Sequence, residues 1–204
     1  MRFALSTLAA VGTLSSLVAA DNIYTYTKPG CSGCAFFFKD IDHNICAVSI
    51  TANATDIADA IAKGVTTVQS GKLEVQECGE KRFIAWDEGP ESNDDGLLQC
   101  GNIDQKLRIT ETSTCITGGN FHGFSWTEPG SDGSDSNSKR QTDDADDVWK
   151  CTGSTEPYGV YLGGKHYQVK DIDQADKDAL MDMAWNDNTD VPSDFEKYAF
   201  TPGM

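Results

Sequence analysis

The sequence predicts a mainly β fold, sandwich- or barrel-like and stapled by disulfides, with one or two short helices. Short segments rich in Val, Ile, Thr, Tyr and Phe recur between clusters of Gly, Pro, Asn and Asp, as in sandwiches and barrels. All seven cysteines follow residue 30, and an apolar leader directs the chain to a compartment in which cysteines pair. An α+β fold is the alternative.

The leader is residues 1–20, MRFALSTLAAVGTLSSLVAA. One basic residue, Arg2, precedes an uncharged apolar stretch, and Val18 and Ala20 occupy the −3 and −1 positions of a cleavage site before Asp21. This is the pattern of a secretory signal peptide, too short and too rich in Ser, Thr and Gly for a bilayer span, which takes about 20 apolar residues. We expect a secreted, extracellular protein without membrane insertion.

The mature chain is strongly acidic. Once Arg2 leaves with the leader, 15 Lys and Arg (16 less one) face 32 Asp and Glu, a net charge of −17. Nucleic acid binding requires a clustered basic face, and anionic lipid attracts polybasic segments, so the charge argues against both. The partners that remain are an extracellular protein or a glycan.

The first third of the mature chain alternates strands and turns. Residues 23–27 alternate aromatic or apolar with polar side chains and predict a strand, and 28–30 supply a Lys-Pro-Gly turn. Residues 35–38, Ala-Phe-Phe-Phe, predict either a buried strand or the first turn of a helix. A second strand is predicted over 45–50, and 55–62 (TDIADAIA) have the clearest pattern for a short helix, which we expect to end near Gly64.

The middle of the chain predicts further strands separated by turns. The candidates are 72–78, 82–88, 97–100, 106–115 and 118–126. Their regular spacing between Gly, Pro, Asn and Asp residues favours a sandwich or a barrel.

Residues 128–147, EPGSDGSDSNSKRQTDDADD, contain no aromatic or large aliphatic side chain. Such a segment cannot offset the entropy cost of ordering, so we predict an acidic flexible linker. It separates a β-rich disulfide domain over 21–127 from a C-terminal segment over 148–204. Within it, Lys139-Arg140 is either a processing site for a kexin-type protease or an ordinary solvated basic pair.

The C-terminal segment predicts a hairpin and a helix. Residues 158–162 and 166–169 flank Gly163-Gly164, a hairpin turn signal. Residues 173–185 have the pattern of an amphipathic helix, and the tail after it, with two prolines, is expected to be irregular.

The cysteines are candidates for disulfides rather than for metal binding: Cys31, Cys34, Cys46, Cys78, Cys100, Cys115 and Cys151. Seven is odd, so at least one lacks an intramolecular partner. We expect Cys46 to pair with Cys31 or Cys34, Cys78 with Cys100, and Cys115 with Cys151. A zinc site needs paired Cys-x-x-Cys units or matched histidines, and the chain has one such unit, so we expect no metal and no cofactor. Asn53 begins a glycosylation sequon.

Residues 24–38, YTYTKPGCSGCAFFF, resemble the active-site region of a glutaredoxin, and 156–166, EPYGVYLGGKH, are similar to the Pro and Gly-Gly region near the end of that fold. The resemblance implies a thiol–disulfide oxidoreductase with Cys31 as nucleophile and Cys34 as resolving thiol. Roughly 120 residues separate the two patches, and three consecutive phenylalanines do not make one amphipathic helix face. Structural pairing of the cysteines is therefore the preferred interpretation.

Two other functions remain open. An extracellular hydrolase is an alternative, but the chain lacks a G-x-S-x-G elbow, and among 32 acidic residues no catalytic pair can be chosen. The aromatic residues Trp86, Trp126 and Trp149 and several tyrosines could stack on sugar rings or pack against a protein. Core burial is the other interpretation of these rings, and Trp126 is the candidate binding residue.

The leader, the cysteine count and the strand-rich middle together resemble the small secreted cysteine-rich proteins of filamentous fungi. In many of these an N-terminal strand runs into a Cys-Ser-Gly motif and an aromatic run, as residues 24–38 do here. The resemblance implies an acidic, extracellular, non-enzymatic glycoprotein that binds at a cell surface or acts on a host or competitor, in the manner of an effector. It carries no catalytic residues with it.

Overall fold

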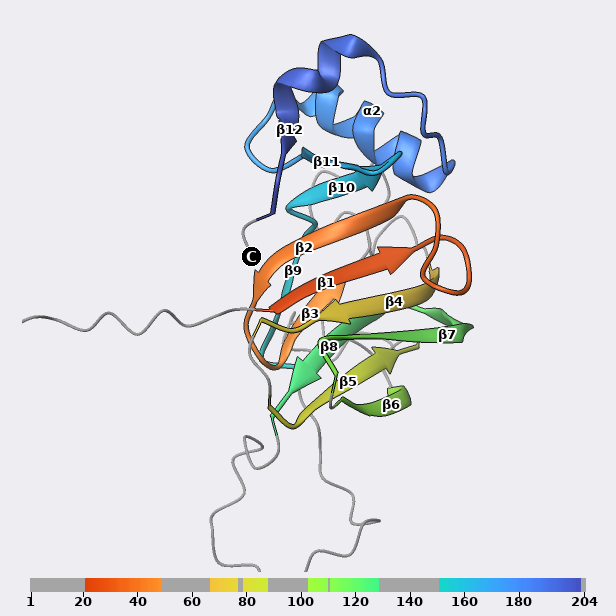
Figure 1. Cartoon of the computed structure of the whole chain (residues 1–204), viewed down its shortest axis with the longest axis vertical. Coiled ribbons are helices and arrows are strands. Elements are labelled where there is room, and N and C mark those ends of the chain that lie inside the picture. Colours follow the sequence, from red (N-terminus) through yellow and green to blue (C-terminus); the bar gives the residue numbers. More distant parts are fainter. Residues whose placement is uncertain are drawn as a thin grey trace, which may run out of the picture.

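The computed structural model describes residues 21–48, 67–76, 79–87, 103–109, 111–128 and 151–202 (Figure 1). They form two β-sheets. The large sheet has the strand order β12-β11-β10-β2-β1-β4-β7, with bounds Ala199–Phe200, Lys165–Gln168, Gly159–Leu162, Ala35–Ile41, Asp21–Tyr26, Val68–Glu74 and Ser113–Phe121. The small sheet has the order β6-β5-β8-β3-β9, with bounds Ile103–Ile109, Lys81–Trp86, Gly123–Thr127, Ile45–Val48 and Gly153–Thr155.

The predicted fold class is confirmed. Strands make up 52% of the structure, the sheets are not closed into a barrel, and two short helices occur in the described residues. These are α2 (Gln174–Trp185) and the 3-10 helix η1 (Ser193–Tyr198). The described part of the chain holds no helix with the length and apolarity that crossing a membrane demands.

The aromatic run after the Cys-x-x-Cys motif is a strand, which settles the choice between strand and helix. In β2, Phe36 and Phe38 belong to the core between the sheets, whereas Phe37 belongs to a separate cluster on the opposite face. Successive side chains of a strand point to opposite faces, so three phenylalanines supply apolar side chains to both. A helix would have spread them around its circumference instead.

The main core lies between the large sheet, the small sheet and α2. Phe83 on β5 and Phe124 on β8 stack with ring centroids 5.3 Å apart and face the inner side of the large sheet. Gly71 on β4 permits this approach, because a Cβ there would meet the Phe124 ring at 2.6 Å. Helix α2 covers the part of the inner face of the large sheet that the small sheet does not. Its Trp185 ring lies 4.7 Å from that of Phe36, measured between centroids.

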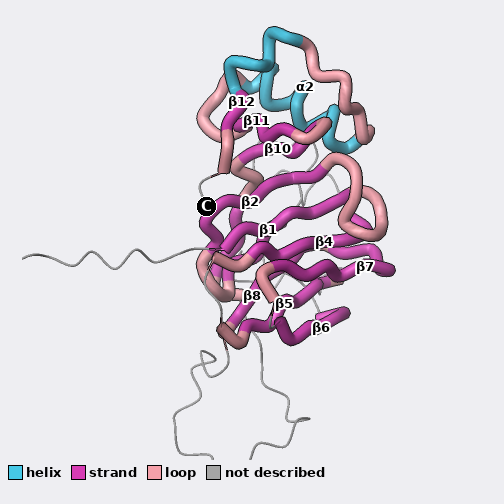
Figure 2. The backbone as a smooth tube through the Cα atoms, in the orientation of Figure 1, coloured by secondary structure: helices cyan, strands magenta, loops and turns pink. Residues whose placement is uncertain are grey.

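The C-terminal segment is part of the same large sheet. The predicted hairpin is confirmed as β10 and β11, and β10 pairs antiparallel with β2 over Gly159–Tyr161 (Figure 2). The predicted helix is confirmed as α2. The expectation of an irregular tail was wrong, because η1 and the short strand β12 follow α2, and β12 pairs with β11.

Several predictions lie outside the described residues. These are the leader, the helix over 55–62, the strand over 97–100, nearly all of the linker over 128–147, the sequon at Asn53, and the processing site Lys139-Arg140.

Candidate functional site on the outer face of the large sheet

Cys31 forms a disulfide with Cys115, 84 residues away in the sequence, with a Cα–Cα distance of 6.1 Å. The predictions that Cys31 pairs with Cys46 and that Cys115 pairs with Cys151 were therefore wrong, and Cys34, the other predicted partner of Cys46, is a free thiol. The physical reason is the sheet order: β4 and β7 return beside β1, so the turn after β1 meets β7 rather than the nearby β3. Cys46 is also disulfide-bonded.

The turn that carries Cys31 folds over the edge formed by β4 and β7. The Cys31 backbone N–H donates to Ser70 Oγ at 2.9 Å, and the Ser70 hydroxyl donates to the Lys28 carbonyl at 2.6 Å. The Gly30 N–H donates to Thr117 Oγ1 at 2.8 Å. The disulfide thus closes a turn that hydrogen bonds between its backbone and the Ser70 and Thr117 hydroxyls already position.

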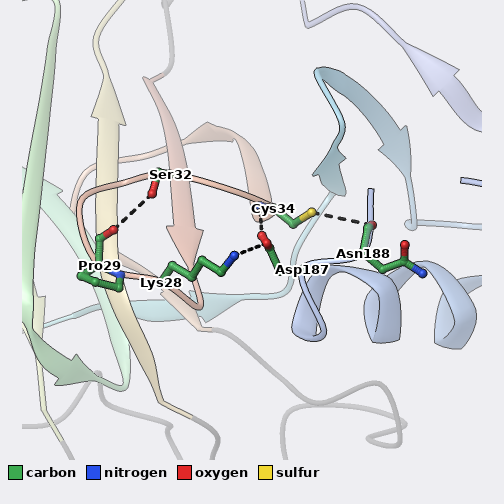
Figure 3. A network of polar contacts seen from close by, with 6 residues as sticks. All are labelled: Lys28, Pro29, Ser32, Cys34, Asp187 and Asn188. Carbon is green, nitrogen blue, oxygen red and sulfur yellow. Dashed lines mark hydrogen bonds and ion pairs between the residues drawn. The ribbon is translucent and has the colours of Figure 1, made fainter. Parts of the chain in front are cut away.

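Cys34 is a buried free thiol, 1% exposed, on the other side of this turn. Its backbone N–H donates to Asp187 Oδ1 at 2.7 Å, Lys28 pairs with Asp187 Oδ2, and its sulfur lies 3.7 Å from the Asn188 carbonyl (Figure 3). Burial, followed by the negative charge of Asp187, raises the pKa of the Cys34 thiol to about 11. A reactive cysteine has a lowered pKa.

These two cysteines do not form the dithiol that exchange chemistry requires. Cys31 is bonded to a distant strand, and Cys34 is protonated and buried. The turn that holds them is a structural element, and the geometry argues against the oxidoreductase alternative.

The outer face of the large sheet, away from the small sheet, carries a group of rings that we call the aromatic cluster. Its members come from β1, β2 and the C-terminal strands and their flanks: Tyr24, Tyr26, Phe37, Tyr158, Tyr161, His166 and Phe200. One face of an antiparallel sheet is commonly solvated and polar. Here the centre of that face is aromatic. The core does not require these rings, because side chains on the inner face of the same strands already fill it.

His166 lies at the centre of the aromatic cluster. Its ring centroid is 4.9 Å from those of Phe37 and Tyr161 and 5.6 Å from that of Phe200. The Tyr24 hydroxyl lies 3.0 Å from His166 Nε2, a hydrogen bond that passes over the two intervening strands β2 and β10. Burial lowers the pKa of His166 below its ordinary value, so the neutral imidazole is favoured.

An ion pair on β4 borders the aromatic cluster. Lys72 Nζ lies 4.5 Å from the centroid of the Tyr24 ring and 2.6 Å from Glu74 Oε1. Burial and the Glu74 carboxylate raise the pKa of the Tyr24 hydroxyl, which therefore stays protonated as a hydrogen-bond donor. The side chains of Lys72 and Glu74 are 27% and 38% exposed, so both polar heads can reach a ligand.

The rings of the aromatic cluster differ in accessibility. Tyr24, Tyr26 and Phe37 are buried. Tyr158, Tyr161 and Phe200 are partly exposed. Buried rings hold the exposed ones in place, and exposed rings beside a charged pair offer stacking together with hydrogen bonding.

The tryptophan chosen from the sequence as a binding residue is a core residue, which corrects that choice. Trp126 is 5% exposed; its indole N–H donates to the Ile41 carbonyl at 2.8 Å, and Lys81 Nζ lies 4.4 Å from the centroid of its ring. Trp86 is likewise buried, and Trp149 lies outside the described residues.

One feature of the sequence does point to the aromatic cluster, namely a predicted strand with large side chains on both of its faces. Tyr24 and Tyr26 alternate with Ile23 and Thr25, so both faces of one strand carry large or β-branched residues. The pairing partners of this strand, which decide what lies beside the two tyrosines, come from residues 35–41 and 68–74 and were not predictable from spacing.

Among the described residues, no group of three or more His, Cys, Asp or Glu side chains could hold a metal ion. No known protein family, no curated protein and no solved structure matches this chain.

Proposed function

We propose that the protein is a secreted, non-enzymatic binding protein, effector-like in its action, that recognises a neutral extracellular glycan through the aromatic cluster. The observation that carries the proposal is the aromatic centre of a sheet face that the core does not need, with partly exposed rings beside a Lys–Glu pair. The signal-peptide pattern and a long-range disulfide support secretion, because such bonds persist in oxidising compartments.

The chemistry of the face favours a neutral glycan. Aromatic rings offer apolar faces on which a sugar ring can stack, and the Lys72–Glu74 pair supplies a donor and an acceptor for hydroxyl groups. The acidic charge of the chain repels acidic sugars. A protein partner would bind through the same rings, so the test must distinguish glycan binding from protein binding.

The test is a glycan array probed with the mature protein, with Tyr161→Ala and Phe200→Ala as variants. Both rings are partly exposed at the rim of the aromatic cluster. We expect binding to neutral glycans, reduced at least tenfold in either variant. Leu107→Ala is the control, because Leu107 is 40% exposed on β6, outside this cluster; it should bind as the parent protein does.

Two results would overturn the proposal. One is the absence of glycan binding from a protein that captures an extracellular protein partner through the same rings. The other is glycan binding that both ring variants retain in full.

A further inference from the structure

Residues 151–202 complete both sheets of the structure built by residues 21–128. In the large sheet, β10 pairs with β2, and the Tyr158 N–H donates to the Phe37 carbonyl at 2.9 Å. In the small sheet, β9 runs parallel to β3, and the Thr152 N–H donates to the Asn44 carbonyl at 2.8 Å. Without this segment, β2 and β3 would each present an unpaired edge.

The same segment supplies part of the common apolar core. Its fully or nearly fully buried side chains, packed in one cluster with those of β1 to β8, are Val160, Leu162, Tyr167, Val169, Leu180, Met181 and Ala184. An interface of this kind resembles a domain core cut in half, which is typical of permanent complexes.

A polar contact joins the two parts at the opposite end of β2. Asp187, just after α2, accepts the Cys34 N–H and pairs with Lys28 in the turn after β1 (Figure 3). Both contacts hold the pKa of the Asp187 carboxyl below its usual range. The aromatic cluster adds rings from both parts, with Tyr24 and Phe37 against Tyr161, His166 and Phe200.

We propose that residues 151–202 remain bound to residues 21–128 when the chain between them is cut, because strand pairing, core packing and the Asp187 contact are sufficient to hold them; processing at Lys139-Arg140 would then yield a stable two-chain protein. The inference is independent of the proposed function, since it depends on strand pairing, apolar burial and the Asp187 contact. It gives the dibasic pair a consequence, namely maturation without loss of the fold.

The test places the recognition sequence of a site-specific protease over residues 137–143 in a Cys151→Ser background. Cys151 is the last cysteine in the sequence, so after its replacement no disulfide can join the C-terminal fragment to the rest. After complete digestion, verified by mass spectrometry, native size exclusion with light scattering should give one species of the uncut mass. Fragments that separate, or that aggregate, would overturn the inference.

A second variant keeps the test valid if the serine variant does not fold. Cys151→Ala also removes any possible disulfide to the C-terminal fragment, and the cut Cys151→Ala protein should run as one species on the native column. Separation of the fragments in a folded Cys151→Ala protein would overturn the inference.

Matched variants test whether the described contacts hold the fragments. In the cut protein, Asp187→Asn should lower the urea concentration at which the fragments separate, because it removes the ion pair with Lys28. Asp190→Asn, an exposed neighbour in the same turn region, is the control and should leave that concentration unchanged. Equal shifts in both variants would assign the association to other contacts and contradict the role given to Asp187.

Discussion

The two faces of the large sheet use the same strands for different purposes. On the inner face, Ile23, Phe36 and Phe38 pack against the small sheet and α2. On the outer face, Tyr24 and Phe37 from the same strands meet His166 and a Lys–Glu pair. The inner face is mainly apolar and closes its few polar groups off from solvent, whereas the outer face combines partly exposed rings with titratable groups, and we propose that recognition takes place there.

The Cys-x-x-Cys motif follows the same division. Cys31 packs against the aromatic cluster and is bonded to Cys115, and Cys34 belongs to the inner core. Three residues apart in the sequence, the two sulfurs serve opposite sides of the sheet. The motif suggests a redox pair, but here one cysteine packs on the outer face of the large sheet and the other packs in the inner core.

The largest expected effect comes from truncating one ring on each face. Phe36→Ala should lower the free energy of unfolding by about 3–5 kcal/mol, because it leaves a cavity in the closed inner core. Phe37→Ala should cost less, about 2–3 kcal/mol, because the partly exposed outer rings can relax into the space. Urea unfolding measures both. Equal losses would mean that the outer face is as closed as the inner one.

The ion pair that closes one end of the inner core should rank next. Lys81 Nζ lies 2.6 Å from Asp21 Oδ2, with side chains 6% and 0% exposed. Lys81→Met should cost about 3 kcal/mol, because it leaves a buried carboxylate without its counterion. The double variant with Asp21→Asn should recover part of the loss in the same urea measurement. A double variant less stable than Lys81→Met would contradict this explanation.

The disulfide on the outer face should contribute a comparable amount. Replacing Cys31 and Cys115 with serine should cost about 2–4 kcal/mol, chiefly by freeing the unfolded chain. Non-reducing peptide mapping of the parent protein should recover the Cys31–Cys115 pair. Cys34 should react with iodoacetamide at pH 8 only after unfolding, because its thiol is buried and its pKa is about 11. A Cys31–Cys34 bond in that map would revive the oxidoreductase alternative.

The smallest expected effect is a pH dependence from His166. The folded state lowers the pKa of this imidazole, whereas an unfolded histidine has a pKa of about 6.5. The unfolded state therefore binds the proton first as pH falls below about 6.5, and stability is lost in that direction. Lys72 and Glu74 also face the site and act in opposite senses.

Urea unfolding at pH 7 and pH 5 tests this dependence by comparing the parent protein with His166→Phe. The parent should lose more stability between the two values than the variant, which keeps an aromatic ring but cannot take up a proton. Measurements at pH 8 and pH 7 serve as the control and should give the same difference for both proteins. Identical losses between pH 7 and pH 5 would show that His166 does not contribute.

Local patterns were sufficient for much of the fold. The alternation around Ile23, the Gly163-Gly164 turn and the apolar spacing over 173–185 predicted β1, the hairpin and α2, because each signal is a property of a few adjacent residues. The tail was misjudged, since Pro192 caps a 3-10 helix whose Phe195 and Tyr198 pack against the core, and that packing is not visible in the local pattern.

The dominance of strands, the abundance of cysteines and the large side chains on both faces of β1 and β2 can all be read from local sequence. The choice of neighbouring strands cannot, because it arises when distant segments pack together. That choice joined Cys31 to Cys115, buried Trp126, and brought His166 beside Tyr24 from 142 residues away. Strand pairing depends on long-range contacts, which spacing along the chain does not encode, and the candidate site exists only through those contacts.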